Sequence, residues 1–222
     1  MVKASGPDEP RGTEERARAF RNHLLQWSED GLREFPWRDT TEPYEILIAE
    51  VLLQKTAAEK VEPVYRNLLA EFPDADELAD SNQKQVAEII YSLGFQNQRS
   101  EALISIAESV QSRGVPNNES ELLELPYVGP YAANATLCFA FGQARAIVDA
   151  NVTRVYNRVF GYNFDYRDDE AWKFAEYMLP EHSARKYNLA ILDFAALVCT
   201  PRSPKCEICS ISEQCQYNQL ID

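Results

Sequence analysis

The stretch LLELPYVGPYAANATLC, residues 122–138, decides the fold. Pro126, Gly129 and Pro130 interrupt it, so that a short helical segment and a longer one are joined in very few residues. A hairpin of this kind turns backbone N–H groups outward at Val128, at Gly129 and at the start of the second helix, where they can hold a phosphate without a basic side chain. A plain corner between two helices fits the same residues, and the stretch alone leaves both interpretations open.

On both sides of this stretch, apolar residues recur at helical spacing, and the alternation typical of strands is scarce. The sequence therefore predicts an all-α protein. Pro43 and Pro63 suit the first turns of helices, while Gly94 and Gly114 suit helix ends. Helices are expected at about residues 13–29, 43–54, 56–72, 83–91, 96–113, 118–124, 130–141, 150–160, 168–179 and 184–198.

The composition is that of an ordinary globular protein with an unusual charge. The 222 residues are 45% hydrophobic, and no apolar run approaches the roughly 20 residues that cross a membrane. The net charge is −13, and residues 40–182, with 11 basic and 23 acidic side chains, hold −12 of it. This balance argues against a non-specific binder of polyanions, but leaves room for a neutral or basic face built from the chain ends. Residues 1–12 lack the apolar stretch of a secretory signal and are predicted to be a flexible tail of a cytoplasmic protein.

Four of the five cysteines crowd into the last 24 residues, as Cys199, Cys206, Cys209 and Cys215. Two disulfides are disfavoured in a reducing cytosol, whereas four thiolates in one loop can enclose a metal centre. The spacing alone favours zinc first and an iron–sulfur cluster second, because both accept four thiolates. Cys138 lies in an apolar run and is interpreted as a small buried side chain.

Two carboxylates stand out by their surroundings. Glu50 lies inside the apolar run ILIAEVLL, residues 46–53, where a carboxylate is expected to be paired or functional. Asp149 follows an apolar segment and precedes a helix, where it can be a helix cap or take part in chemistry. Because burial favours the protonated form of a carboxyl group, the two would supply an acid and an anion.

Together these features resemble the helix-hairpin-helix DNA glycosylases, over about residues 30–216. The matching pieces are FPWR (35–38), PYEILIAEVLLQKT (43–56), LPYVG (125–129), VDAN (148–151) and ILDF (191–194), which leads into Cys199. The resemblance implies two helical lobes with a central cleft. Residues 40–148 would form a barrel lobe with the hairpin, and residues 13–39 with 149–222 the second lobe. It also implies that the four terminal cysteines hold a 4Fe–4S cluster rather than zinc.

Family members with lyase activity carry a nucleophilic Lys two residues after the second hairpin Gly, where it forms a Schiff base with the sugar. That position here is Tyr131, and a phenol cannot form an imine. The resemblance therefore implies a monofunctional DNA N-glycosylase of base excision repair. Asp149 would stabilise positive charge on the sugar and position water, and Glu50 would help the base leave by donating a proton or holding a water.

Two branches of the family fit these residues: mismatch glycosylases of the Mig type, which remove thymine or uracil opposite guanine, and adenine glycosylases of the MutY type, which act opposite guanine or 8-oxoguanine. Residues 148–151 resemble the thymine type, and Leu189 stands where adenine enzymes usually carry a Gln. The chain also ends seven residues after Cys215, without a further domain to read oxidised guanine. Residues 141–143, FGQ, are shared with adenine enzymes, which remain the alternative.

The implied partner is double-stranded DNA with a mismatched base, bound by a monomeric, nucleoid-associated enzyme. Gln54 and Lys55 lie where the family inserts a polar wedge into the gap left by the flipped base. Arg202 and Lys205 are expected to contact phosphate.

Two hairpin positions depart from the family pattern. Tyr127 replaces the first hairpin Gly and Pro130 removes an N–H, which is expected to weaken phosphate binding there. A third interpretation is a cluster-containing DNA-binding module without catalysis, and the presence of both Glu50 and Asp149 argues against it.

Overall fold

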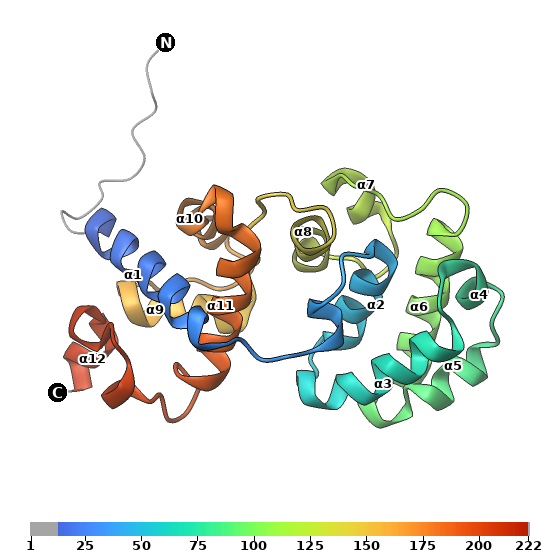
Figure 1. Cartoon of the computed structure of the whole chain (residues 1–222), viewed down its shortest axis with the longest axis horizontal. Coiled ribbons are helices and arrows are strands. Elements are labelled where there is room, and N and C mark those ends of the chain that lie inside the picture. The colour runs from blue at the N-terminus through green and yellow to red at the C-terminus, as the bar shows by residue number, and fades with distance from the viewer. Residues whose placement is uncertain (1–12, 222) are drawn as a thin grey trace, which may run out of the picture. The chain divides into compact units, whose positions relative to one another are not determined.

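The computed structural model of the chain describes residues 13–221, which form helices and loops without a strand (Figure 1). The all-helical class predicted from the sequence is therefore confirmed. The chain divides into two compact units: a middle unit of residues 34–145, and a terminal unit that combines residues 13–33 with 146–221. None of the helices in this part of the chain has the length and hydropathy of a membrane span. The predicted tail, residues 1–12, lies outside the described residues.

In the middle unit, α2 lies at the centre of the core. All its residues from Ile46 to Leu52 are buried, and the helix packs against α3, α6 and α8. A helix that is apolar all round is stable only inside a core. Pro43 starts it, at a position where the missing N–H leaves no hydrogen bond unmade. The elements of this unit are η2 (Pro36–Arg38), α2 (Pro43–Leu53), α3 (Ala58–Glu71), α4 (Ala75–Ala79), α5 (Gln83–Ile89), η3 (Tyr91–Leu93), α6 (Gln96–Val110), α7 (Glu119–Glu124) and α8 (Pro130–Phe139).

In the terminal unit, helices from opposite ends of the chain pack together. The blue α1 lies beside the orange-red α11 in Figure 1, and the Phe194 ring meets Phe20 and Trp27 edge-to-face at centroid distances of 6.2 and 5.8 Å. Such aromatic contacts join segments far apart in sequence into one core. The elements of this unit are α1 (Thr13–Trp27), η1 (Ser28–Asp30), α9 (Ala150–Phe160), α10 (Asp169–Met178), η4 (Glu181–Ser183), α11 (Ala184–Leu197), η5 (Cys206–Ile208), η6 (Ser212–Gln214) and α12 (Gln216–Ile221).

Two short helices and one proline differ from the sequence-based expectation. α4 and α12 are not among the expected helices, because five and six residues are too few to show a periodic apolar pattern. A local signal marks α4, since the carboxylate of Asp74 caps it by accepting a hydrogen bond from Glu77 N at 2.9 Å. Pro63 lies inside α3 and not in its first turn, so the helix lacks one internal hydrogen bond there.

Candidate functional site

The hairpin predicted at residues 122–138 consists of α7, a short turn and α8. Val128 N donates to Leu125 O at 3.3 Å, and Tyr127 adopts a left-handed φ of 62°. Glycine adopts this region without strain, which explains physically why Gly is usual at this turn position. The first residue of α8 is Pro130, and the cap residue Gly129 makes no side-chain hydrogen bond. The start of α8 therefore has no internal anion.

The loop that follows α2 contacts this turn. Gln54 Nε2 donates to Tyr127 O at 3.3 Å, and Lys55 adopts a left-handed φ of 57°. The side chains of Gln54 and Lys55 are exposed, whereas that of Val128 is buried and its N–H donates to Leu125 O, so we expect a phosphate contact of the hairpin at Gly129 and the start of α8 rather than at Val128. The structure thus brings the predicted wedge residues and the hairpin together in one place.

The buried carboxylate of the middle unit belongs to Glu50. Its residue is 5% exposed, and it precedes Gln54 by one helical turn of α2. Tyr131, in the first turn of α8, is half-buried, and α8 packs against α2. A carboxylate in an apolar core is unstable in its charged form unless it is paired or used, which makes Glu50 the candidate acid of this unit.

The carboxylate of the terminal unit, Asp149, is the cap residue of α9 and is half-buried. Oδ1 accepts hydrogen bonds from Asn151 N at 2.8 Å and Val152 N at 2.7 Å, while Oδ2 accepts one from Asn151 Nδ2 at 2.7 Å. Three donors and the positive end of the helix dipole therefore hold this carboxylate in place. A carboxylate held in this way has a fixed orientation.

Two arginines of α9 tie this carboxylate's helix to the start of the cysteine loop. Arg154 Nη1 donates to Asn151 Oδ1 at 2.9 Å, and its Nε donates to Cys199 O at 3.1 Å. Arg158 Nη1 lies 3.5 Å from Cys199 Sγ and donates to Thr200 O at 2.7 Å. Burial lowers the pKa of Arg154. A continuous chain of hydrogen bonds therefore runs from Asp149 to Cys199, which the sequence did not predict.

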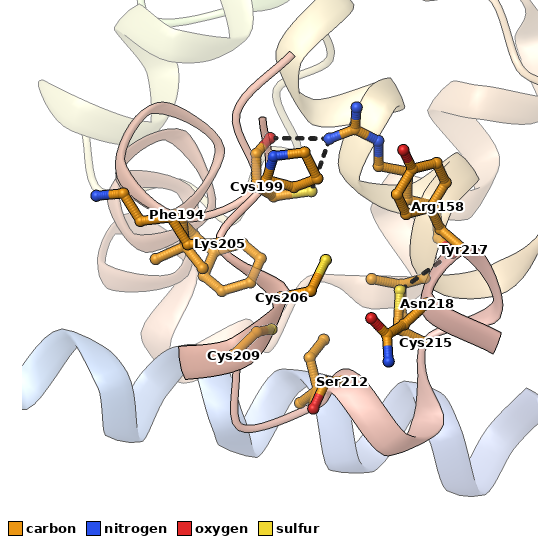
Figure 2. A pocket seen from close by; sticks show the side chains of 14 residues that line it. Arg158, Phe194, Cys199, Lys205, Cys206, Cys209, Ser212, Cys215, Tyr217 and Asn218 are labelled. Carbon is orange, nitrogen blue, oxygen red and sulfur yellow. Dashed lines mark hydrogen bonds between the residues drawn. The ribbon is translucent and has the colours of Figure 1, made fainter. Parts of the chain in front are cut away.

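The four terminal cysteines line one pocket, together with Arg158 (Figure 2). All four are free thiols; Cys199 and Cys215 are buried, and Cys206 and Cys209 are half-buried. Burial raises the pKa of Cys206 and Cys209, and the neighbouring thiols raise both further. A cation among them would reverse this mutual repulsion, because thiolate is the form that binds metal.

The donor set fits a metal centre of four thiolates. Among residues 13–221, no three His, Cys, Asp or Glu side chains already meet in a metal-binding arrangement. The four thiols nevertheless line one pocket, and rotation about one side-chain bond is enough to turn each thiol toward a shared metal centre. The four cysteines in one pocket are therefore the candidate ligands.

The remaining predicted residues are distributed over both units. Leu189 is half-buried on α11, which packs against α9. Arg202 and Lys205 are exposed on the cysteine loop, and Lys205 N donates to Val198 O at 2.9 Å. Cys138, which the sequence places in the core, is 1% exposed within α8, so that prediction is confirmed.

An all-helical fold with this hairpin, a capping Asp downstream of it and a terminal loop of four cysteines defines a class of DNA repair enzymes. The chain belongs to the HhH-GPD superfamily of base excision DNA repair proteins, which its residues 48–179 match. Residues 199–215 match the iron–sulfur binding domain of endonuclease III. The chain is therefore a member of a DNA glycosylase family, and its cofactor is a 4Fe–4S cluster.

Individual relatives narrow the comparison. The chain is 37% identical over 211 residues to a thymine/uracil-DNA glycosylase of Methanothermobacter thermautotrophicus, covering 92% of this chain and 96% of that protein. It is 31% identical to an adenine DNA glycosylase of Buchnera aphidicola subsp. Baizongia pistaciae, of which it spans 58%. The solved structure of a thermostable thymine-DNA glycosylase matches with a TM-score of 0.90 and 37% identity, covering 94% of this chain and 99% of that one.

Proposed function

We propose that this chain is a monofunctional DNA glycosylase that removes thymine or uracil opposite guanine. The observation that carries the proposal is a likeness over nearly the full length of both proteins to a thymine/uracil-DNA glycosylase, combined with Tyr131 in the first turn of α8. The adenine glycosylase relative is less similar and matches over only part of its own length.

In the proposed reaction, the mismatched base leaves the duplex and its N-glycosidic bond is hydrolysed. The bond's electron pair goes to the departing base, and Glu50 donates a proton to that base or holds the water that does. Asp149 stabilises the positive charge that develops on the sugar and positions a water at C1′. That water adds its hydroxyl group to C1′ and gives its proton to Asp149.

Tyr131 decides what the enzyme does after base removal. Strand cleavage through a Schiff base needs an amine, which forms a covalent bond to the sugar C1′. A phenol at this position offers no amine, so the abasic strand stays intact. We therefore expect no lyase product from the wild-type enzyme.

DNA binding in this acidic protein would depend on few basic side chains. The backbone N–H of Gly129 and the uncapped start of α8 would hold one phosphate. The exposed side chains of Arg202 and Lys205 would contact another part of the strand. Gln54 and Lys55 would occupy the gap in the opened duplex.

Leu189 supports the choice of base. Its half-buried aliphatic side chain offers only apolar contact, whereas a purine selected by hydrogen bonds would need a polar group. Thymine or uracil mispaired with guanine leaves the stack at lower cost than a Watson–Crick pair does, and this supplies part of the selectivity.

The cofactor would be held by Cys199, Cys206, Cys209 and Cys215. When bound, the cluster supplies a rigid cross-link of the loop rather than any atom of the reaction, because its four ligands lie on the loop while the reacting carboxylates lie elsewhere. We propose that the enzyme is a monomer and acts on chromosomal DNA in the cytoplasm. Size-exclusion chromatography with light scattering tests the monomeric state.

A panel of duplexes tests the function. Single strands labelled at one end carry thymine, uracil or adenine opposite guanine, and adenine opposite 8-oxoguanine. We expect nicks in the G·T and G·U duplexes only after alkaline treatment. Leu189→Gln should raise adenine release, and Tyr131→Lys should add cleavage without alkali. Release of adenine with G·T and G·U left untouched would establish the adenine alternative instead, and binding without any release would establish a non-catalytic module.

A further inference from the structure

A buried cation in the middle unit joins two of its loops. Arg99, in α6, is 8% exposed. Its Nη2 donates to Gln54 O at 2.6 Å and to Thr56 Oγ1 at 2.7 Å, and its Nη1 donates to Leu93 O at 3.2 Å. Gln54 and Thr56 belong to the loop after α2, and Leu93 ends η3, just before α6. One side chain therefore fixes the two loops to each other.

The same region carries every left-handed non-glycine residue of the described chain. These are Lys55, Phe95 and Tyr127, with φ of 57°, 53° and 62°. The conformation is strained because Cβ approaches a backbone oxygen, and it persists where surrounding bonds hold it. Arg99 donates hydrogen bonds to both neighbours of Lys55, which are Gln54 and Thr56. The Gln54 side chain in turn donates a hydrogen bond to Tyr127 O.

Two of these three strained residues are aromatic, and their side chains lie in water instead of in the core. Phe95 is 70% exposed and Tyr127 is 45% exposed, and both line a pocket with Gln54, Gln98 and Arg99. Rings held in water contribute little to the apolar burial that stabilises the fold. Flat rings beside amide groups are suited to stacking on nucleobases and to hydrogen bonds with their edges.

We propose that Arg99 is a positioning residue for base extrusion, which holds Gln54 and Phe95 in the arrangement that supports an opened base pair. This inference rests on the proposed function, because only an enzyme that extrudes a base needs such support. The planar guanidinium suits the task, since its fork reaches two loops at once and a Lys ammonium does not. Among the residues described, the guanidinium bonds only to carbonyl and hydroxyl oxygens, so its removal leaves no buried carboxylate unpaired.

The test compares two substrates that differ only in the base opposite uracil. One duplex carries uracil opposite guanine, and the other carries uracil opposite a tetrahydrofuran abasic analogue, where there is no pair to open. Arg99→Met should lower the single-turnover excision rate on the first duplex roughly 10-fold to 100-fold, the equivalent of about one hydrogen bond from a charged donor. On the second duplex the rate should fall by less than about threefold. Arg99→Lys should lie between wild type and Arg99→Met.

Two controls separate positioning from folding. Arg66→Met removes an exposed guanidinium that pairs with Glu62 on α3 and should leave both rates unchanged. Fluorescence of 2-aminopurine placed beside the uracil reports extrusion directly, and Arg99→Met should reduce its rise on binding. An equal fall on both duplexes, or no fall on either, would overturn the proposal.

The 2-aminopurine signal also keeps this inference separate from the proposed function. A wild-type protein that releases no base from any duplex refutes the proposed function, whereas the role of Arg99 is still decided by extrusion. If wild type and Arg99→Met then give the same fluorescence change with the G·U duplex, or neither gives one, the positioning role is rejected.

Discussion

The helices α8 and α9 both begin after a residue with extended backbone, Gly129 at α8 and Asp149 at α9. At α9 the carboxylate of the cap residue accepts the N–H groups of Asn151 and Val152. At α8 no side chain caps the first turn. Both helix starts carry the partial positive charge of a helix dipole, but a side chain caps α9 and none caps α8.

The uncapped start of α8 offers an acidic chain a place to bind DNA phosphate. A negative charge at a helix start is stabilised by about 0.3–1 kcal/mol, and up to about 2 kcal/mol where it is partly buried. In α9 the carboxylate of Asp149 itself occupies this position. In α8 the same effect is available to a phosphate of the DNA, without a lysine or arginine at that point.

The largest effect is expected from a variant that removes the support of α9 and leaves α8 unchanged. Arg154 and Arg158 attach α9 to the backbone around Cys199. Cys206→Ser removes one thiolate of the centre, so the purified protein should lose its yellow-brown colour and most of its about four irons. Structural metal sites contribute on the order of 10 kcal/mol to folding, so amide hydrogen exchange should rise strongly in α9.

The matched control for that experiment is the fifth cysteine. Cys138→Ala changes a buried thiol of α8, so it should cost about 1 kcal/mol of unfolding free energy while the iron content stays the same. Exchange that rises equally in α8 and α9 of Cys206→Ser would show that the cluster does not stabilise the terminal unit selectively.

The next effect separates the cap from the chemistry at α9. Asp149→Asn keeps a side-chain oxygen for the cap but removes the charge, so excision should fall roughly 10²–10³-fold. The unfolding free energy should fall by only about 0.3–1 kcal/mol, the contribution of a charge at a helix start, because Asn caps helices as well as Asp does. Single-turnover kinetics and thermal melting measure the two. Asp74→Asn changes the cap carboxylate of α4 and should leave excision intact; a wild-type rate in Asp149→Asn would make that residue a cap and nothing more.

A third variant gives α8 an acidic cap residue like that of α9. A Cβ at Gly129 would meet nothing within 4 Å, and its φ of −97° suits any residue. Gly129→Asp should stabilise the protein by about 0.5 kcal/mol and weaken DNA binding about tenfold, because the new carboxylate takes the N–H groups and repels the phosphate. Fluorescence anisotropy at two salt concentrations should show a smaller deficit at higher salt. Gly129→Ser, a cap without charge, is the control; equal loss in both variants would exclude the electrostatic explanation.

Much of the fold follows from the sequence, because Pro and Gly mark where helices begin and end. The helix expected at residues 150–160 is α9, with the same bounds, and it ends at Gly161, whose φ is 77°. α6 stops three residues before the expected end, since Gly114 N bonds to Val110 O at 2.7 Å and closes the helix early. Short helices such as α12 escape detection because their packing, and not their periodicity, makes them helical.

The candidate site is only partly predictable, for a different reason. Glu50 and Asp149 can be found in the sequence because each is a carboxylate inside or next to an apolar run. The four terminal cysteines can be found by their spacing. Arg99 and Arg154 cannot be found in this way, because each bonds to a backbone carbonyl 45 residues away, and every residue of the chain has such a carbonyl. Only the folded chain shows which arginines are buried and what they hold.

The smallest expected effect is a pH dependence confined to the terminal unit, which contains both histidines, whereas the unit of α8 has none. His23 Nδ1 lies 2.7 Å from Ser210 Oγ, its ring meets Phe194 edge-to-face at 5.7 Å, and burial lowers its pKa. A folded-state pKa below the unfolded value of about 6.5 means that the unfolded chain binds more protons as the pH falls through this range, so stability decreases.

His23→Gln should therefore reduce the drop in Tm between about pH 7.5 and about pH 5.5 by roughly 1–3 °C, measured by calorimetry. Gln keeps a hydrogen-bonding group for Ser210 without a titrating proton, so the difference from wild type isolates the imidazole. His182→Gln, at an exposed position in η4, should leave the drop as it is in wild type. If His23→Gln loses as much Tm on acidification as wild type does, the acid sensitivity comes from carboxylates shared by both units, and α9 and α8 would then respond to pH alike.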